Sequence, residues 1–274
     1  MPTREDQEAA AVLDAHVQET LWTVERATAP IYREELGRPV PNGSAVLLRV
    51  GDRPFALTAA HVTDNSALFP LYIGSSSQPV RLDGTKIASK LKPRQTRADD
   101  PLDVAVLSLS DITARHLPEQ EFIDTTQLDA GRANLDDETF LVAGYPRTKR
   151  RDIPEQGMLE VTLYPFLACS RLRTAYARNR RDPSHHIVLS FSKKRLWRRG
   201  VHVIAPDLDE MSGCGVWSIY DAAGSLIARP RLAGLFTEWH RDDQPWLCAT
   251  RIEVALSAIW ENFPDLRSAL PRLD

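Results

Sequence analysis

The sequence predicts an all-β body with a helix at each end. From about residue 43 to residue 250, short apolar runs alternate with turn residues such as Gly, Pro, Asn and Asp, a pattern typical of β-strands joined by loops. No alternation of strands with long helical segments and no internal repeat interrupts this series, which argues against an α/β fold. At 274 residues the chain can form one large or two small domains with proper apolar cores.

The two expected helices lie outside this region. From about Arg4 to Tyr32, apolar or weakly polar residues recur at spacings of three and four, and Ala29-Pro30 ends the pattern. We expect this helix to pack across the β-body and to cover apolar surface; a docking or regulatory helix is the alternative. From 251 to 260 the apolar period is again helical.

The predicted strands fall into two groups, separated by a polar segment at 118–137 that we interpret as a linker. The first group comprises residues 45–50, 54–58, 71–73, 80–82 and 104–107, and the second comprises 139–144, 158–166, 186–191, 215–220, 226–236 and 246–250. The turn residues 51–53 join the first two runs and predict a hairpin.

Composition and cysteine usage indicate a soluble protein in a reducing compartment. Apolar residues make up 43% of the chain and charged residues 26%, and no run of about 18 apolar residues exists to cross a membrane. The first residues are acidic and polar, without the basic start and apolar run of a secretory signal. The three cysteines are far apart and lack metal-type spacing. We therefore expect a cytoplasmic protein without membrane contact.

Three short segments carry the residue types of nucleophilic catalysis. Ser212 lies in a turn of small residues ahead of an apolar strand, where a hydroxyl can stand beside free backbone N–H groups. His61 ends an apolar strand, and Asp103 opens another. Asp99 and Asp100 are the alternative acids near the same position. The other histidines have no comparable surroundings.

These segments support a resemblance. Thr58-Ala59-Ala60-His61, Asp103-Val104-Ala105-Val106-Leu107 and Ser212-Gly213-Cys214-Gly215 resemble the His, Asp and Ser boxes of the trypsin-like (chymotrypsin-fold) serine endopeptidases, in the same chain order. Residues 140–146 and 232–236 are similar to further strands of bacterial members of that family, and the resemblance covers about 43–260. It implies two six-stranded antiparallel β-barrels at 39–118 and 138–250, a linker at 119–137, an N-terminal helical extension at 1–38 and a C-terminal helix and tail at 251–274.

The resemblance also implies a mechanism for cleaving protein or peptide substrates. His61 would take the proton of Ser212 as the hydroxyl attacks a peptide carbonyl, and Asp103 would hold and stabilise the imidazole. The backbone N–H groups of Glu210 and Ser212 would form the oxyanion hole. No metal or cofactor is required.

Two residues depart from the family pattern. Glu210 stands where the family usually has glycine, and a carboxylate near a developing oxyanion is unfavourable unless it points to solvent. Met211 stands where digestive trypsins have an aspartate that pairs with a newly cut N-terminus, so activation of that kind is not expected. We attach to these changes the hypothesis of control by a regulatory protein partner or by loop reordering.

Specificity and the identity of the nucleophile leave alternatives open. By resemblance, residues 205–209 and 235–239 wall the primary pocket, with Pro206, Asp207, Glu238 and Trp239 as candidates. Asp207 or Glu238 would favour a basic substrate side chain, whereas Trp239 would narrow the pocket so that it accepts small side chains.

Cys214 is an alternative nucleophile, although a small buried thiol is the preferred interpretation.

Charge is unevenly distributed along the chain. Residues 147–199 hold fourteen Lys or Arg against four acids, so that this segment carries about +10 and the remainder about −13. We interpret the segment as solvated loops, because no nucleic-acid-binding motif accompanies it; a surface that binds an acidic partner such as nucleic acid is the alternative. The alternative function is a protease-fold binding or regulatory module in which Glu210 has ended catalysis.

Overall fold

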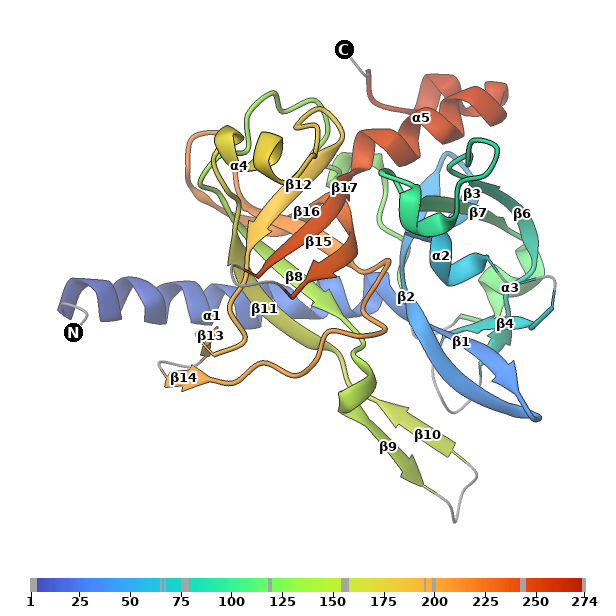
Figure 1. Cartoon of the computed structure of the whole chain (residues 1–274), viewed down its shortest axis with the longest axis horizontal. Coiled ribbons are helices and arrows are strands. Elements are labelled where there is room, and N and C mark those ends of the chain that lie inside the picture. Colours follow the sequence, from blue (N-terminus) through green and yellow to red (C-terminus); the bar gives the residue numbers. More distant parts are fainter. Residues whose placement is uncertain are drawn as a thin grey trace.

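Two curled antiparallel sheets form the body of the molecule in the computed structural model (Figure 1). The structure describes residues 4–64, 66, 68–74, 79–117, 120–153, 158–194, 196–198, 201–241 and 245–272. One sheet has seven strands in the order β5-β4-β1-β2-β3-β7-β6, and the other has six in the order β11-β8-β15-β16-β17-β12. The predicted all-β class with two barrel-like units is confirmed, with seven strands rather than six in the first.

The elements follow one another along the chain with these bounds. The first sheet contains β1 (Thr28–Glu35), β2 (Arg38–Val50), β3 (Arg53–Ala59), β4 (Leu71–Ile73), β5 (Val80–Arg81), β6 (Gly84–Ala88) and β7 (Val104–Leu109). The second contains β8 (Thr139–Gly144), β11 (Tyr164–Cys169), β12 (His186–Ser190), β15 (Gly215–Tyr220), β16 (Leu226–His240) and β17 (Trp246–Arg251). Two ribbons are formed by β9 (Arg150–Ile153) with β10 (Met158–Val161), and by β13 (Leu196–Arg198) with β14 (Val201–Val203).

The helices lie around these sheets. The α-helices are α1 (Arg4–Ala27), α2 (Ala60–Thr63), α3 (Asp111–Arg115), α4 (Arg173–Arg178) and α5 (Ile252–Asn262). The 3₁₀ helices are η1 (Arg97–Asp99), η2 (Thr125–Gln127), η3 (Arg147–Lys149) and η5 (Pro264–Ala269). Among the residues that the structure describes, no helix is long and apolar enough to span a membrane.

The N-terminal helix is shorter than predicted. It ends at Ala27, and residues 28–35 form β1, which pairs with β2 and β4. The prediction of helix as far as Tyr32 is therefore wrong for its last residues. Pro30 disfavours a helical conformation at the residue before it, and residues 28–32 are fully buried in the sheet, where pairing outweighs helical propensity. The first sheet thus begins ahead of the expected boundary at 39.

Alternating side chains of β2 enter two different cores. Ala45 and Leu47 belong to an apolar cluster inside the first sheet, whereas Val46 and Leu48 belong to a cluster shared with the second sheet. This division follows from the two-residue period of a strand. Residues of α1 and α5 join the shared cluster, so the helices cover apolar surface between the sheets, as Figure 1 shows for α1 along the second sheet. A third cluster fills the second sheet.

Candidate active site

The His61 ring is held by Asp103 at one end of the first sheet. Nδ1 of His61 lies 2.6 Å from Oδ2 of Asp103, and the His61 backbone N–H donates to Oδ1 at 2.9 Å. His61 follows β3 and Asp103 precedes β7; because these strands are paired, their ends lie together. The Asp103 side chain is 6% exposed and that of His61 is 40% exposed. The acid is therefore buried behind an imidazole that keeps access to solvent.

The two alternative acids have other partners. Asp99 accepts hydrogen bonds from the backbone N–H and the hydroxyl of Thr96. Asp100 forms an ion pair with Arg97 at 2.5 Å and accepts a hydrogen bond from the Ser89 hydroxyl. Of the three acids, Asp103 is the one joined to the His61 ring by a hydrogen bond within the described part of the chain.

The loop that carries Asp103 is braced by the second sheet. His186 Nε2 lies 2.7 Å from the carbonyl oxygen of Pro101, and the Thr250 hydroxyl donates to the carbonyl oxygen of Leu102 at 2.5 Å. Asp103 itself has a φ of 43°, a left-handed conformation in which Asp and Asn are better tolerated than most residues. Contacts from both sheets thus fix the position of the Asp103 carboxylate.

The turn that carries Ser212 comes from the second sheet and packs on the first. The backbone N–H of Ser44 in β2 donates to the carbonyl oxygen of Ser212 at 2.9 Å. Gly213 has a φ of 87°, and a Cβ at this position would lie 2.1 Å from the Thr58 hydroxyl oxygen and 2.2 Å from the Ser44 carbonyl oxygen. Only glycine fits there. The glycine therefore lets the serine turn approach β3, the strand that leads into His61.

The Ser212 hydroxyl is oriented toward the second sheet. Its Oγ donates to the carbonyl oxygen of Thr237 at 3.2 Å. Among the hydrogen bonds of the described residues, none joins this hydroxyl to the His61 ring. The structure brings His61 and Asp103 into direct contact and packs the Ser212 turn against β2 and β3, with the Ser212 hydroxyl bonded to Thr237.

Two backbone N–H groups of the turn are available as donors. Met211 N–H donates to Leu208 and Gly213 N–H donates to Phe236. Within the described residues, the N–H groups of Glu210 and Ser212 donate to no protein acceptor. These are the two groups expected to form the oxyanion hole, and free donors of this kind stabilise a developing oxyanion.

The Glu210 side chain is packed near this position. Its φ is 70°, a left-handed value typical of glycine. Burial raises the pKa of Glu210 to about 7, although the charges of Arg147, Arg150 and Arg33 act in the opposite direction. The carboxyl is only 18% exposed, so it does not point freely to solvent.

The neighbours of Ser212 are apolar. Met211 and Cys214 are both fully buried in the core of the second sheet. Burial raises the pKa of the Cys214 thiol far above its ordinary value, and only the thiolate is a nucleophile. Cys214 is thus a buried structural thiol, and Met211 makes no ion pair of the zymogen type.

Solved structures resemble this arrangement of two sheets. Neuropsin, a serine protease expressed in the limbic system of mouse brain, matches with a TM-score of 0.55 and 15% sequence identity over 86% of this chain and 93% of neuropsin. GrC (granzyme C) matches with a TM-score of 0.55 and 16% identity over 88% of this chain and 96% of GrC. The chain has the chymotrypsin fold. A scan of protein-family models and a search of curated proteins find no match.

Both acids predicted to line the primary pocket of this chymotrypsin fold are already paired. Asp207 forms an ion pair with Lys193 at 2.7 Å. Glu238 lies 2.6 Å from His240 Nε2 and also pairs with Arg181. Burial opposes ionisation of Glu238, but these two partners outweigh it and hold the pKa of Glu238 below its ordinary value. Neither acid is a free charge for a basic substrate side chain.

The two remaining pocket candidates are Trp239 and Pro206. Trp239 packs edge-on against Phe191 at 5.6 Å between ring centroids, and the Arg241 guanidinium lies 4.0 Å from the Trp239 ring centroid. Arg241, two residues beyond the second predicted wall, also pairs with Asp209 of the first wall. Pro206 is half-buried in the first wall.

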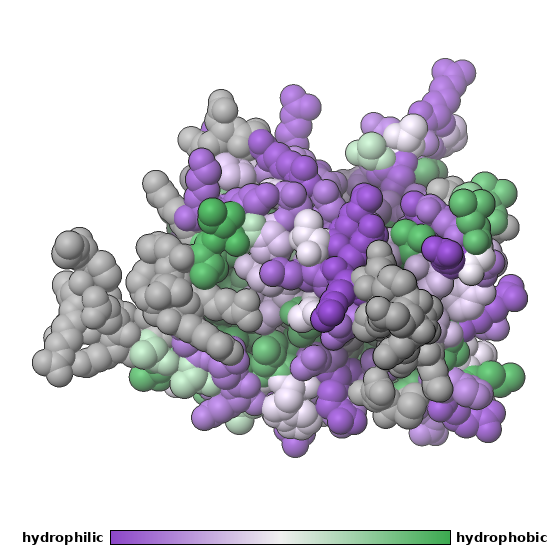
Figure 2. All heavy atoms as spheres, turned by 90° about the horizontal axis from the view of Figure 1, so that it is seen from below, coloured by the Kyte–Doolittle hydropathy of each residue, from purple (hydrophilic) through white to green (hydrophobic). Residues whose placement is uncertain are grey.

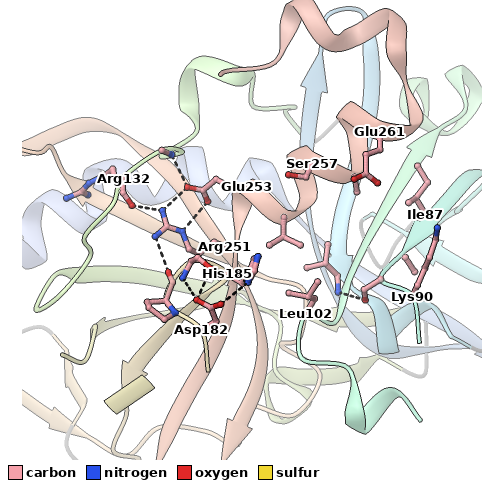
Figure 3. Close-up of a pocket in the computed structure, with 18 of the residues that line it drawn as sticks. Ile87, Lys90, Leu102, Arg132, Asp182, His185, Arg251, Glu253, Ser257 and Glu261 are labelled. Atoms are coloured by element: carbon pink, nitrogen blue, oxygen red, sulfur yellow. Dashed lines mark hydrogen bonds and ion pairs between the residues drawn. The ribbon is translucent and has the colours of Figure 1, made fainter. Parts of the chain in front are cut away.

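A cavity of about 1180 Å³ lies behind the Asp103 loop rather than beside the serine turn (Figure 3). Leu102 and Val104, on either side of Asp103, line it together with residues of β6, α5 and the 182–185 segment. On its far wall Arg251 forms an ion pair with Glu253 at 2.7 Å. Because His61, Asp103 and Ser212 are not among the described residues that line it, we interpret the cavity as a structural gap between the two sheets.

Sequence reasoning missed several residues of the site. Ser44 holds the Ser212 carbonyl, Thr58 packs against Gly213, and Thr237 accepts the Ser212 hydroxyl. Each contact joins segments that are far apart in the chain, and although Thr58 lies in the His box and Thr237 in a predicted pocket wall, no pattern along the chain indicates these contacts. Gly43 also approaches the serine turn closely, since a Cβ at this position would lie 3.1 Å from the Ser212 carbonyl oxygen.

Proposed function

We propose that the protein is a serine endopeptidase that cleaves protein substrates through an acyl-enzyme, with His61, Asp103 and Ser212 as its triad. The observation that carries this proposal is the His61–Asp103 pair at 2.6 Å, beside a turn that presents Ser212 from the other sheet. The chymotrypsin fold supports it, because solved structures of that fold include serine proteases. Three free thiols are consistent with a reducing compartment, and we propose a cytoplasmic location.

The first half of the reaction begins with rotation of the Ser212 hydroxyl away from the Thr237 carbonyl toward His61 Nε2. Oγ attacks the substrate carbonyl carbon while its proton passes to His61. Asp103, on the opposite ring nitrogen, stabilises the imidazolium that forms. The N–H groups of Glu210 and Ser212 stabilise the oxyanion. When the C–N bond breaks, His61 returns the proton to the leaving amine and the acyl group stays on Ser212.

Water completes the cycle by the same route. His61 removes a proton from a water molecule that attacks the acyl carbonyl, and the proton is then returned to Ser212 Oγ as the ester bond breaks. Each step uses side chains and backbone groups of this chain.

Incubation of an unfolded protein substrate with the purified chain tests the proposal. We expect peptide fragments, and an acyl-enzyme on Ser212 when an activated ester substrate is trapped in acid. The Ser212→Ala variant should yield neither. Fragments produced equally by wild type and Ser212→Ala would refute the assignment of Ser212.

The second candidate function is a protease-fold binding or regulatory module with little catalysis of its own. Two observations favour it: the buried Glu210 carboxyl beside the oxyanion position, and the hydrogen bond that holds the Ser212 hydroxyl against Thr237. A regulatory protein partner that moves the Glu210 turn would reconcile both candidates. Cellular fractions, and then the proteins separated from them, can be added to the purified chain while its activity is measured. Constant activity across all additions would count against such a partner.

A further inference from the structure

Three arginines from different elements of the fold act on the Glu210 carboxyl: Arg147 at 3.9 Å, and Arg150 and Arg33 through their charge. Arg147 begins η3, and its backbone N–H donates to the carbonyl oxygen of Asp209 at 2.9 Å. Arg150 begins β9 and Arg33 lies on β1. The β9–β10 ribbon and the β1–β2 hairpin extend from the same lower side of the molecule (Figure 1). Figure 2 shows this face, on which hydrophilic side chains cover much of the surface.

Arg33 is fixed beside the His61 helix. Its guanidinium donates to Asn42 Oδ1 at 3.4 Å and pairs with Glu35 at 2.5 Å. Asn42 in turn donates to the carbonyl oxygen of Val62, the residue after His61, at 2.7 Å. Arg33 Nε is buried and has no hydrogen-bond partner within the part of the chain that the structure describes. The Arg33 guanidinium is therefore held in place beside the His61 helix.

The Glu210 carboxyl forms no short hydrogen bond with these arginines among the described residues. Its Oε1 lies 3.9 Å from Arg147 Nε, which is longer than the roughly 2.7–2.9 Å of a charge-assisted hydrogen bond. Its Oε2 is buried and has no partner among the described residues. The side chains of Arg147 and Arg150 are exposed. Arg147 and Arg150 thus carry more positive charge and more donors than Glu210 uses, whereas Arg33 also pairs with Glu35.

We propose that Arg33, Arg147 and Arg150 form a binding site for an acidic side chain of the substrate, and that Glu210 occupies this site when no substrate is bound. The residue order gives the location: Glu210 is two positions from Ser212, so their Cα atoms are at most about 7 Å apart. The acidic side chain therefore lies within about two residues of the cleaved bond. This inference rests on the proposed endopeptidase function and names its substrate class as proteins with Asp or Glu next to the cleavage site.

An incoming carboxylate improves the site in two ways. It can form the bidentate hydrogen bonds that guanidinium groups make with carboxylates. It also displaces Glu210, which removes a carboxylate from the neighbourhood of the developing oxyanion. Burial already raises the pKa of Glu210 to about 7, which is consistent with a carboxyl that is weakly held where it lies.

A peptide series tests the inference through kinetics. Short internally quenched peptides carry Asp, Asn or Lys at one position, moved stepwise across the cleavage site. We expect Asp within two residues of the cut to raise kcat/KM about tenfold over Asn, and Lys to lower it. The Arg147→Ala/Arg150→Ala variant should lose this preference. Glu210→Gln should increase it at neutral pH and above, because the competing charge is gone.

The matched control is Arg151→Ala. Arg151 follows Arg150 on β9 and is also exposed, but successive strand residues point to opposite faces, and Arg151 is not among the charges that act on Glu210. This variant removes one positive charge from the same ribbon, whereas the double variant removes one from the ribbon and one from η3, and it should keep the preference for Asp. Unchanged circular dichroism spectra of the variants show that the fold is intact.

Binding to the Ser212→Ala protein gives a readout that needs no catalysis. A fluorescent Asp-containing peptide should bind about tenfold tighter than its Asn counterpart, and about 0.5 M salt should reduce the difference. Equal binding and equal kcat/KM for Asp, Asn and Lys peptides would overturn the inference. If a fluorophosphonate labels Ser212 of the wild type but the peptides show no preference for Asp, the proposed function is supported and the inference is refuted. Acid-selective binding without labelling or cleavage would refute the function and retain the site.

Discussion

Asp103 contacts His61 twice, through the ring nitrogen at 2.6 Å and through the backbone N–H at 2.9 Å. The two bonds use the two carboxylate oxygens, so the acid fixes both the orientation of the imidazole and the turn that carries it. An asparagine at position 103 has one side-chain oxygen in place of two. It can therefore keep the hydrogen bond from the His61 backbone N–H while it changes the contact with the ring.

Asp103→Asn should lower kcat by about 10⁴-fold while the fold is kept. Asn tolerates the left-handed φ of 43° found at this position, but a neutral amide cannot stabilise the imidazolium and favours the wrong tautomer. Steady-state kinetics and thermal unfolding measure the two effects separately. A variant that is as active as wild type would remove Asp103 from the proposed mechanism.

Gly213→Ala should unfold the site or the protein. The added Cβ meets the Thr58 hydroxyl oxygen at 2.1 Å in addition to the strain of a φ of 87°. Gly224→Ala is the matched control, because Gly224 has a φ of 78° but no atom within 4 Å of an added Cβ. The control should cost about 1–2 kcal/mol from backbone strain alone, and Gly213→Ala should cost several kcal/mol more. Equal losses in urea denaturation would contradict the close packing of the serine turn.

Thr250→Val should reduce kcat with little change in KM. It removes the hydroxyl that donates to Leu102 in the Asp103 loop at 2.5 Å, at a cost of about 1–3 kcal/mol in the free energy of unfolding. Thr113→Val is the control, since the buried Thr113 hydroxyl donates to the Arg81 carbonyl at 3.1 Å, in a different part of the first sheet. Both variants should lose similar stability, but only Thr250→Val should lose activity. An equal loss of kcat in both variants would show a general effect of stability.

Glu210→Gln should stabilise the protein at alkaline pH and change it little in acid. Because the folded-state pKa is raised from 4.5 to about 7, the folded protein binds more protons than the unfolded chain, and stability is lost as pH rises between these values. Above about pH 7 the cost of the buried charge reaches about 3 kcal/mol at most, and the glutamine avoids it. Urea denaturation at about pH 4 and pH 8 measures the difference.

Glu238→Gln should change the free energy of unfolding in the opposite direction from Glu210→Gln. The pKa of Glu238 lies below its ordinary value, because His240 and Arg181 outweigh the effect of burial. Its contribution to stability is present above the unfolded pKa and is lost as pH falls through the folded pKa. Glu238→Gln should therefore be less stable than wild type near neutral pH. If both variants were stabilised, or both destabilised, at neutral pH and above, the result would contradict the environments described for Glu210 and Glu238.

Some of the structure was readable from the sequence because local pattern and fold agree. The runs at 139–144 and 215–220 match the bounds of β8 and β15, where apolar residues lie between clear turn signals. The His, Asp and Ser boxes lie at strand ends, which placed His61 and Asp103 correctly at the paired ends of β3 and β7. In these places tertiary structure adds little to what the short segment already favours.

Other features depend on contacts between distant segments. The polar and partly exposed strand β6 (residues 84–88) has no apolar alternation, so only its pairing with β7 defines it. The run at 158–166 divides into β10 and β11, which pair with different strands. The arginines around Glu210 come from β1, η3 and β9, and no pattern along the chain links them. The Ser212–Thr237 hydrogen bond is likewise a product of the folded sheet.

Stoichiometric labelling with a fluorophosphonate tests the central claim most directly, because the reagent reports whether the Ser212 hydroxyl becomes a nucleophile beside His61. We predict one label per chain, located on Ser212 by mass spectrometry, with loss of the label in Ser212→Ala and a much slower reaction in His61→Ala. A folded wild-type protein that stays unlabelled, or a Ser212→Ala variant labelled at the same rate, would contradict the account.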